Sequence, residues 1–227
     1  MNPVKHIIEK AHNYGVPVLI DGAQAIQHGK VDVQEMDADF YVFSGHKMYG
    51  PTGIGVLYGK EKILNELPPY QTGGEMVDQV SFNKTTFNRL PFKFEAGTPN
   101  YIGAIGMAAA IEYLQETGLV EINSYEKDLL EYGTLRLSEI NGLYLFGQAN
   151  EKISVLSFVL EDIHPYDAGM ILDKSGIAVR TGNHCAQPVM ERFGIRGTIR
   201  ASLAFYNTRE EIDSLCKAVM KVIQMFN

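Results

Sequence analysis

Three short polar clusters in the sequence follow apolar runs and contain residue types that can do chemistry. They are Asp-Gly-Ala-Gln at residues 21–24, Ser-Gly-His-Lys at residues 44–47, and Arg-Thr-Gly-Asn-His-Cys-Ala-Gln-Pro at residues 180–188. The first two follow runs that look like parallel strands, and ligands of open α/β sheets bind outside the carboxyl ends of such strands. We therefore expect the first two clusters to contribute to one site.

Asp21 and Lys47 together suit the needs of pyridoxal 5'-phosphate (PLP). Alone, such an aspartate is more often a turn or helix cap, and such a lysine usually reaches water. PLP, however, requires a lysine for its aldehyde, an anion that keeps the pyridine nitrogen protonated, and donors for its phosphate. Gln24 could hydrogen-bond the ring oxygen, and Ser44, His46 and backbone amides could hold the phosphate.

Cys185 lies in the third cluster, in a polar loop that contains glycine, and has His184 beside it. Cations nearby stabilise a thiolate and the loop gives access, so we interpret Cys185 as a nucleophile. Cys216 instead lies among apolar residues at helical spacing, which is typical of a core position. A zinc site at His184 and Cys185 is disfavoured because no second close Cys or His supplies the ligand spacing, so no metal is expected.

The first half of the chain predicts an open α/β sheet. Apolar residues at helical spacing indicate a helix over residues 4–14, closed by Gly15, and the apolar runs 16–20 and 39–43 are typical of buried parallel strands. A third strand is expected at residues 53–58. An opening helix without a preceding strand leaves a βαβ unit unfinished, so we expect a further segment ahead of it in a complete protein.

The second half predicts a compact α+β domain after an irregular stretch at residues 68–97, with residues 1–117 and 118–227 as the two domains. Thr98 and Pro99 look like an N-cap followed by proline at the first helical position. The expected helices are residues 102–115, 120–137, 166–174 and 209–225, and the expected strands are residues 153–160, 177–180 and 198–201.

Composition limits the partners and the compartment. The net charge is −7 and no run of Lys or Arg could track phosphates, so nucleic acid is not expected as a partner. No segment has the apolar length of a membrane span, and no membrane partner is expected. Two cysteines in a chain of 227 residues fit a reducing compartment, and we expect the cytoplasm.

Four motifs resemble cysteine desulfurases, and specifically their second, selenocysteine-lyase-like group within the class V aminotransferases, which are PLP enzymes of fold type I. The motifs are Val-Leu-Ile-Asp-Gly-Ala-Gln (18–24), Phe-Ser-Gly-His-Lys (43–47) with Gly-Pro-Thr-Gly-Ile-Gly (50–55), Phe-Glu-Ala-Gly-Thr-Pro-Asn (94–100) and the cluster at 180–188. The resemblance implies a partial large α/β sheet domain and a complete small α+β domain.

The resemblance also implies roles for single residues. Lys47 would form the Schiff base, Asp21 would pair with the pyridine nitrogen and Cys185 would be the nucleophile. Thr98 matches a position that reaches the phosphate of the neighbouring subunit's cofactor, which implies a homodimer. The other implied roles are ring-oxygen contact for Gln24, phosphate binding for Ser44 and His46, and substrate-carboxylate binding for Arg200, assisted by Arg180.

The implied reaction converts L-cysteine to L-alanine and leaves a persulfide on Cys185 for a sulfur acceptor or scaffold protein of iron–sulfur cluster assembly. The chain departs from the family in two places. Asn183 stands where the branch commonly has His, and the segment at Met1–Lys5 aligns with an internal family segment, which would leave out the first part of the large domain. We expect little activity from this chain alone, and two alternatives stay open: a noncatalytic binding module and a selenocysteine lyase.

Overall fold

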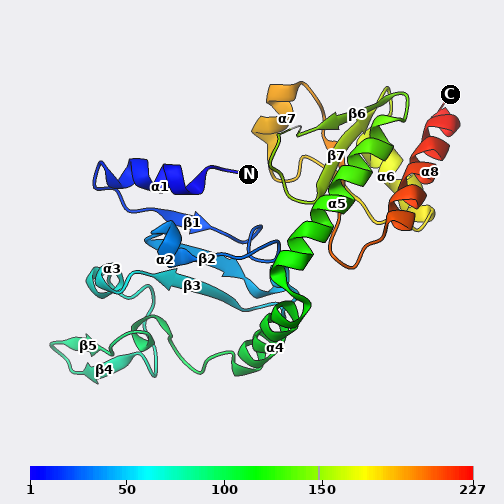
Figure 1. Cartoon of the computed structure of the whole chain (residues 1–227). Coiled ribbons are helices and arrows are strands. Elements are labelled where there is room, and N and C mark those ends of the chain that lie inside the picture. The colour runs from blue at the N-terminus through cyan, green and yellow to red at the C-terminus, as the bar shows by residue number, and fades with distance from the viewer. Residues whose placement is uncertain (148, 227) are drawn as a thin grey trace. The chain divides into compact units, whose positions relative to one another are not determined.

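The structure of the protein is a computed structural model that describes residues 1–147 and 149–226 (Figure 1). Packing divides it into two compact units. The first comprises Asn2–Leu119, and the second comprises Met1 and the residues from Val120 onward. Each unit carries its own sheet.

A three-stranded sheet in the order β1-β2-β3 forms the centre of the first unit. Strand β1 (Leu19–Asp21) runs parallel to β2 (Phe40–Ser44), and β3 (Gly55–Gly59) runs antiparallel to β2. The elements around the sheet are α1 (Val4–His12), α2 (Val33–Met36), the 3-10 helix η1 (Gly45–Met48) and α3 (Glu61–Glu66). The sheet and the parallel β1-β2 pair agree with the sequence prediction.

The predicted burial of these strands is wrong for β1. Leu19 is 55% exposed, and among the described strands β1 pairs with β2 alone. The strand also begins later than predicted. Pro17 has no N–H to donate, and the N–H of Val18 donates to Asp39 Oδ2 at 2.7 Å instead of to a neighbouring strand.

A charged cluster, which we call the Asp39 cluster, ties the ends of these three strands together. Asp39, whose side chain is 7% exposed, precedes β2, and its Oδ2 contacts His12 Nε2 at 2.8 Å as well as the Val18 N–H. Its Oδ1 lies 3.0 Å from Lys60 Nζ, directly after β3. Lys60 also pairs with Asp37. The cluster thus fixes where α1, β1, β2 and β3 meet.

The segment predicted to be irregular contains a small antiparallel hairpin, β4 (Val77–Val80) and β5 (Thr85–Phe87), and a 3-10 helix, η2 (Phe92–Phe94). The rest of it is loop. Helix α4 (Tyr101–Thr117) follows. Its cap is Asn100, whose Oδ1 accepts from the Gly103 N–H at 2.9 Å, so the prediction of Thr98 as the N-cap is wrong. Thr and Asn both cap well, and the structure uses the later residue.

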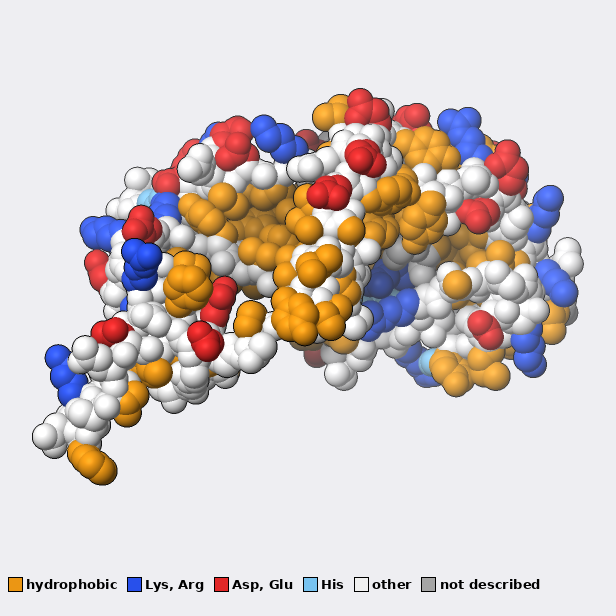
Figure 2. Space-filling view, turned by 90° about the horizontal axis from the view of Figure 1, so that it is seen from below, with side chains coloured by type: hydrophobic (Ala, Val, Ile, Leu, Met, Phe, Trp, Pro, Cys, Tyr) orange, Lys and Arg blue, Asp and Glu red, His pale blue; other side chains and the backbone are white. Residues whose placement is uncertain are grey.

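Helix α4 presents apolar side chains to the surface, and Figure 2 shows hydrophobic side chains gathered on the face to which it contributes. Ile102 and Ile105 are 72% and 70% exposed. Their spacing of three residues places both on one face of the helix.

A four-stranded antiparallel sheet in the order β6-β7-β9-β8 forms the second unit together with four helices (Figure 1). The strands are β6 (Leu143–Phe146), β7 (Val155–Leu160), β8 (Arg180–Gly182) and β9 (Thr198–Ser202), and the helices are α5 (Leu119–Ser138), α6 (Pro165–Lys174), α7 (Gln187–Phe193) and α8 (Arg209–Phe226). The sequence did not predict β6 or α7, and it placed β8 three residues too early.

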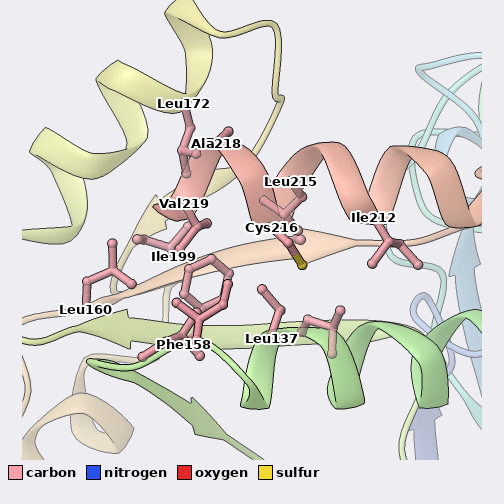
Figure 3. Packing of buried hydrophobic residues seen from close by; sticks show 14 of the residues in the cluster. Leu137, Phe158, Leu160, Leu172, Ile199, Ile212, Leu215, Cys216, Ala218 and Val219 are labelled. Atoms are coloured by element: carbon pink, nitrogen blue, oxygen red, sulfur yellow. The ribbon is translucent and has the colours of Figure 1, made fainter. Parts of the chain in front are cut away.

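The core of this unit lies between one face of the sheet and the helices α5, α6 and α8 (Figure 3). Phe158 of β7 and Ile199 of β9 point into it and are fully buried. Cys216 of α8 lies in the same cluster at 2% exposure, which confirms its interpretation as a core residue. Because strand side chains alternate, Ser157, Thr198 and Arg200 point to the opposite face of the sheet. No helix among the described residues combines the length and the apolar character needed to cross a membrane.

Candidate active site

Lys47 lies in the tight turn that follows β2. Gly45 begins this turn, and its N–H donates to Ile54 O at 2.8 Å. A Cβ on Gly45 would lie 3.0 Å from Ile54 Cγ2 and 3.1 Å from the carbonyl oxygen of Pro51, so a larger residue would push the two loops apart by a few tenths of an ångström. Lys47 itself is half-buried, and the described residues offer its amine no hydrogen bond or ion pair. The amine is therefore available to a ligand.

Asp21 ends β1 beside β2, with Val42 as its register partner. One carboxylate oxygen accepts from the Ala23 N–H at 3.0 Å. The side chain is exposed and has no cationic partner within the part of the chain that the structure describes. The parallel pairing of β1 and β2 places Asp21 and Ser44 at the carboxyl ends of neighbouring strands, as the sequence predicted.

Tyr41 packs against the residue that follows Asp21. A Cβ on Gly22 would lie 1.9 Å from Tyr41 Cζ and from its hydroxyl oxygen. Tyr41 is 2% exposed, and its hydroxyl has no hydrogen-bond partner among the described residues. Burial, together with the negative charge of Asp21, raises the pKa of this phenol. The phenol therefore stays neutral, and its ring packs against the turn that follows Asp21.

The donor set of the first unit fits PLP. Among the described residues, the Lys47 amine has no partner, the Asp21 carboxylate has no cation, and Ser44 and His46 lie in the turn after β2, which meets the three requirements of the cofactor. Lys47 would hold the aldehyde and Asp21 the ring nitrogen. The side chains of Gln24 and His46 are exposed and that of Ser44 is half-buried, so all three can turn toward a ligand.

Thr98 is exposed and precedes α4. The start of α4 is tied to the loop after Lys47, because Asn100 Nδ2 donates to Gly53 O at 3.2 Å. Within residues 1–147 and 149–226, no hydrogen bond joins Thr98 itself to the lysine turn.

Cys185 lies in the second unit, in an exposed loop between β8 and α7. The Arg180 guanidinium donates from Nη2 to Cys185 Sγ at 3.6 Å. The Cys185 N–H donates to Asn183 Oδ1 at 3.1 Å, which closes a small turn. His184 and Cys185 both have positive φ angles, 54° and 60°. The loop therefore presents an accessible thiol beside a fixed cation, which is the setting of a reactive cysteine.

Arg180 and Arg200 face each other across the pairing of β8 and β9. Burial and the charge of Arg180 lower the pKa of the Arg200 guanidinium from its usual value. The Nε of Arg200 is buried and unpartnered in the described structure, and neither guanidinium has an ion pair there. Two neighbouring guanidiniums with unused donors form a site for a carboxylate.

Three further side chains, those of His184, Thr198 and Ser157, complete this polar face, and neither Thr198 nor Ser157 was predicted as a site residue. His184 Nε2 lies 2.8 Å from Thr198 Oγ1 and 3.2 Å from its carbonyl oxygen, and Ser157 Oγ lies 3.3 Å from the same Oγ1. Alternation along β9 was the available signal, because Thr198 lies two residues before Arg200 and so shares its face. Within the described part of the chain, no group of Asp, Glu, His and Cys side chains has the arrangement of a metal site.

Comparison with known proteins identifies the family. The family model described as aminotransferase class-V matches residues 1–215. The chain belongs to the class-V aminotransferase family. Members of this family are PLP-dependent enzymes, and the α/β fold of type I predicted from the sequence is confirmed.

Several proteins similar to this chain are named cysteine desulfurases, the group that the four motifs resemble. A cysteine desulfurase of Synechococcus elongatus is 53% identical over 98% of this chain and 36% of its own length. A probable cysteine desulfurase of Halalkalibacterium halodurans is 49% identical over 100% of this chain and 55% of its own length. The crystal structure of the cysteine desulfurase CsdA from Escherichia coli matches with a TM-score of 0.93 and 42% identity, over 98% of this chain and 55% of that one. The chain thus spans between about a third and just over half of the length of these proteins.

Proposed function

We propose that this chain carries the Schiff-base lysine, the nucleophile and the substrate-carboxylate site of a cysteine desulfurase, which converts L-cysteine to L-alanine and a protein-bound persulfide. The observation that carries the proposal is the exposed thiol of Cys185, which lies 3.6 Å from the guanidinium of Arg180. Arg180 pairs across the sheet with Arg200, whose Nε has no hydrogen-bond partner among the described residues. Relatives named cysteine desulfurase at about 50% identity support the same reaction.

Arg200 would bind the carboxylate of L-cysteine through a two-pronged hydrogen bond, assisted by Arg180. PLP, when bound, supplies an electron sink for negative charge next to the amino group. Asp21 would keep the ring nitrogen protonated, and the amine of Lys47 would take the proton from the substrate's α-carbon.

The Cys185 thiolate would then attack the sulfur of the substrate. A sulfur–sulfur bond forms on Cys185 while the carbon–sulfur bond of the substrate breaks, and the bonding electrons of the latter stay with the carbon that becomes the methyl group of alanine. A proton delivered to that carbon, and a second proton returned to the α-carbon, complete alanine. The sulfur remains as a persulfide on Cys185 for transfer to an acceptor or scaffold protein.

We further propose a homodimer in which Thr98 reaches the phosphate of the partner's cofactor. The exposure of Thr98 supports this role. The exposed apolar pair Ile102 and Ile105 lies on the helix that Thr98 precedes, and exposed apolar side chains of this kind are typical of contact surfaces. The two unbridged cysteines support a reducing compartment, for which we propose the cytoplasm.

Alanine release tests the proposed reaction. Because the chain spans only 36% to 55% of these relatives, we expect little steady-state activity from it alone. A slow single turnover should nevertheless release about one alanine per chain from L-cysteine, since the persulfide blocks the thiol until an acceptor removes it. Cys185→Ala should abolish this release and keep the absorbance of bound cofactor. Cys216→Ala, a change at the buried cysteine, is the matched control and should leave the release unchanged.

Three outcomes separate the proposal from its alternatives. A chain that stays colourless with added PLP and releases no alanine is a noncatalytic binding module. Release from L-selenocysteine but not from L-cysteine indicates a selenocysteine lyase. Release from L-cysteine that survives Cys185→Ala contradicts the assignment of the nucleophile.

A further inference from the structure

The histidine next to the proposed nucleophile has a contact pattern that determines where its proton lies. Thr198 O is a carbonyl and can only accept a hydrogen bond, and it lies 3.2 Å from His184 Nε2. The same Nε2 lies 2.8 Å from Thr198 Oγ1. An unprotonated Nε2 would bring its lone pair against that of the carbonyl oxygen. Nε2 therefore carries the proton and donates it to Thr198.

The hydroxyl of Thr198 then has a free proton of its own. It can donate to Ser157 Oγ at 3.3 Å, so the contacts form a chain from His184 through Thr198 to Ser157. Thr198 is 2% exposed, and the side chains of Thr198 and Ser157 lie on the sheet face that carries Arg200. His184 is thus bonded to the rigid strands β9 and β7, although it belongs to a loop.

The other ring nitrogen is placed where a proton would be unfavourable. His184 Nδ1 is buried and has no hydrogen-bond partner among the described residues. Burial and the positive charge of Arg200, with a further contribution from Arg180, lower the pKa of His184, and the bond to Thr198 only partly opposes them. The charged groups that face this ring are both cations, so the neutral ring is the form that the site favours.

The backbone of the loop needs such an anchor. His184 and Cys185 are consecutive non-glycine residues with φ of 54° and 60°, a conformation that L-residues rarely adopt and that persists only where surrounding contacts hold it. The Asn183 side chain bonds the Cys185 N–H from one side. The bond from His184 to β9 holds the same turn from the other side.

We propose that His184 is a positioning residue that fixes Cys185 against Arg180 and that its ring stays neutral and takes no proton from the Cys185 thiol. Arg180 then provides the positive charge beside the sulfur, at 3.6 Å, in place of an imidazolium. The site differs in this respect from a cysteine–histidine pair, in which the histidine accepts the thiol proton. The proposal rests on the proposed function, since it assigns the residue that orients the nucleophile of that reaction.

Alkylation of Cys185 by iodoacetamide tests the positioning role without cofactor or substrate. His184→Gln places an amide N–H near the position of Nε2 and so keeps the bond to Thr198, but it cannot take up a proton. We expect its rate to stay within about twofold of the original chain from pH 6 to 9, with the same pH profile. His184→Ala removes the bond, and its rate at pH 7 should fall about five- to tenfold because the thiol is no longer held against Arg180.

Three results of the alkylation experiment would contradict the proposed role of His184. If His184→Gln loses as much reactivity as His184→Ala, or loses a step from the pH profile, the ring exchanges a proton with the thiol and the proposal is wrong. An unchanged rate in His184→Ala also overturns it. Thr198→Val keeps the carbonyl acceptor and removes the hydroxyl, and its rate should lie between the two variants. It provides the same test if His184→Ala does not fold, and a rate equal to the original would count against the anchor.

Nitrogen NMR of the imidazole gives a readout that a purely structural role would not affect. With 15N-labelled histidine, His184 should show a protonated Nε2 and a bare Nδ1 between pH 6 and 8, identified by its absence in His184→Gln. An imidazolium at pH 7, or a proton on Nδ1, would overturn the proposal. Since neither measurement needs turnover, a failed alanine assay would leave this inference standing, and a failed alkylation test would leave the alanine assay standing.

Discussion

Replacing Asp39 by Asn is expected to destabilise the first unit by about 2 to 3 kcal/mol at neutral pH. The carboxylate is 7% exposed and receives hydrogen bonds from His12, Lys60 and the Val18 N–H. Burial alone would raise the pKa of Asp39, but these bonds outweigh it and lower the pKa from 3.8 to about 2. A shift of nearly two units corresponds to about 2.5 kcal/mol of stability that asparagine cannot supply.

The pH dependence follows from the direction of the shift. A carboxylate with a lowered pKa in the folded state stabilises fully above its unfolded value of 3.8, and this contribution is lost as the pH falls from 3.8 toward 2. The difference in stability between the original chain and Asp39→Asn should therefore shrink as the pH falls below 4.

Hydrogen exchange at the Val18 amide is the most local assay, because this N–H donates directly to Asp39. The free energy of opening should fall by the stated amount in Asp39→Asn. Asp37→Asn is the matched control, since it removes a carboxylate from the same cluster, but one that is 64% exposed, and exposed ion pairs contribute little. The reasoning is refuted if the two variants lose equal protection, or if the effect of Asp39→Asn is unchanged at pH 3.

Three further predictions concern the site and its surroundings. Gly22→Ala should lower the stability of the first unit by about 1 to 3 kcal/mol in urea unfolding, because its Cβ would lie 1.9 Å from Tyr41; no loss would mean that the ring does not pack on this turn. The double variant Ile102→Glu and Ile105→Glu should convert the proposed dimer to a monomer in light scattering, whereas Leu135→Glu, at an exposed site on α5, should not. An unchanged molecular mass in the double variant would show that α4 does not form the dimer interface. Arg180→Met should slow alkylation of Cys185 at pH 7 about tenfold, while Arg180→Lys should slow it less, and equal rates in all three proteins would show that the guanidinium does not act on the sulfur.

Much of the fold could be predicted because its signals are long or repeated. The helices over residues 4–12 and 209–226 follow clear apolar spacing, and the parallel pair β1 and β2 follows from two apolar runs. Strand β6 has only four residues and α7 only seven, and Pro188 near the start of α7 made that segment look like loop. Short elements such as these depend on neighbours that a local pattern does not describe.

The residues of the candidate site were predicted from their types, but the contacts that hold these residues in place were not. Asp21, Lys47, Cys185 and Arg200 were identifiable because each type has a chemical use at a strand end or in a loop. The contact of His184 with Thr198 joins residues 14 positions apart, and the packing of Tyr41 on Gly22 joins two strands. Such contacts depend on strand register and loop conformation, which only the folded structure specifies.

Locating the transferred sulfur tests most directly whether Cys185 is the nucleophile. The chain is loaded with PLP, incubated with L-cysteine, labelled at persulfides and digested, and the two cysteine-containing peptides are compared by mass spectrometry. The account predicts one extra sulfur atom on the peptide that contains Cys185 and none on the peptide that contains the buried Cys216. Extra sulfur on both peptides in equal amount, or alanine release with no sulfur on Cys185, would contradict it.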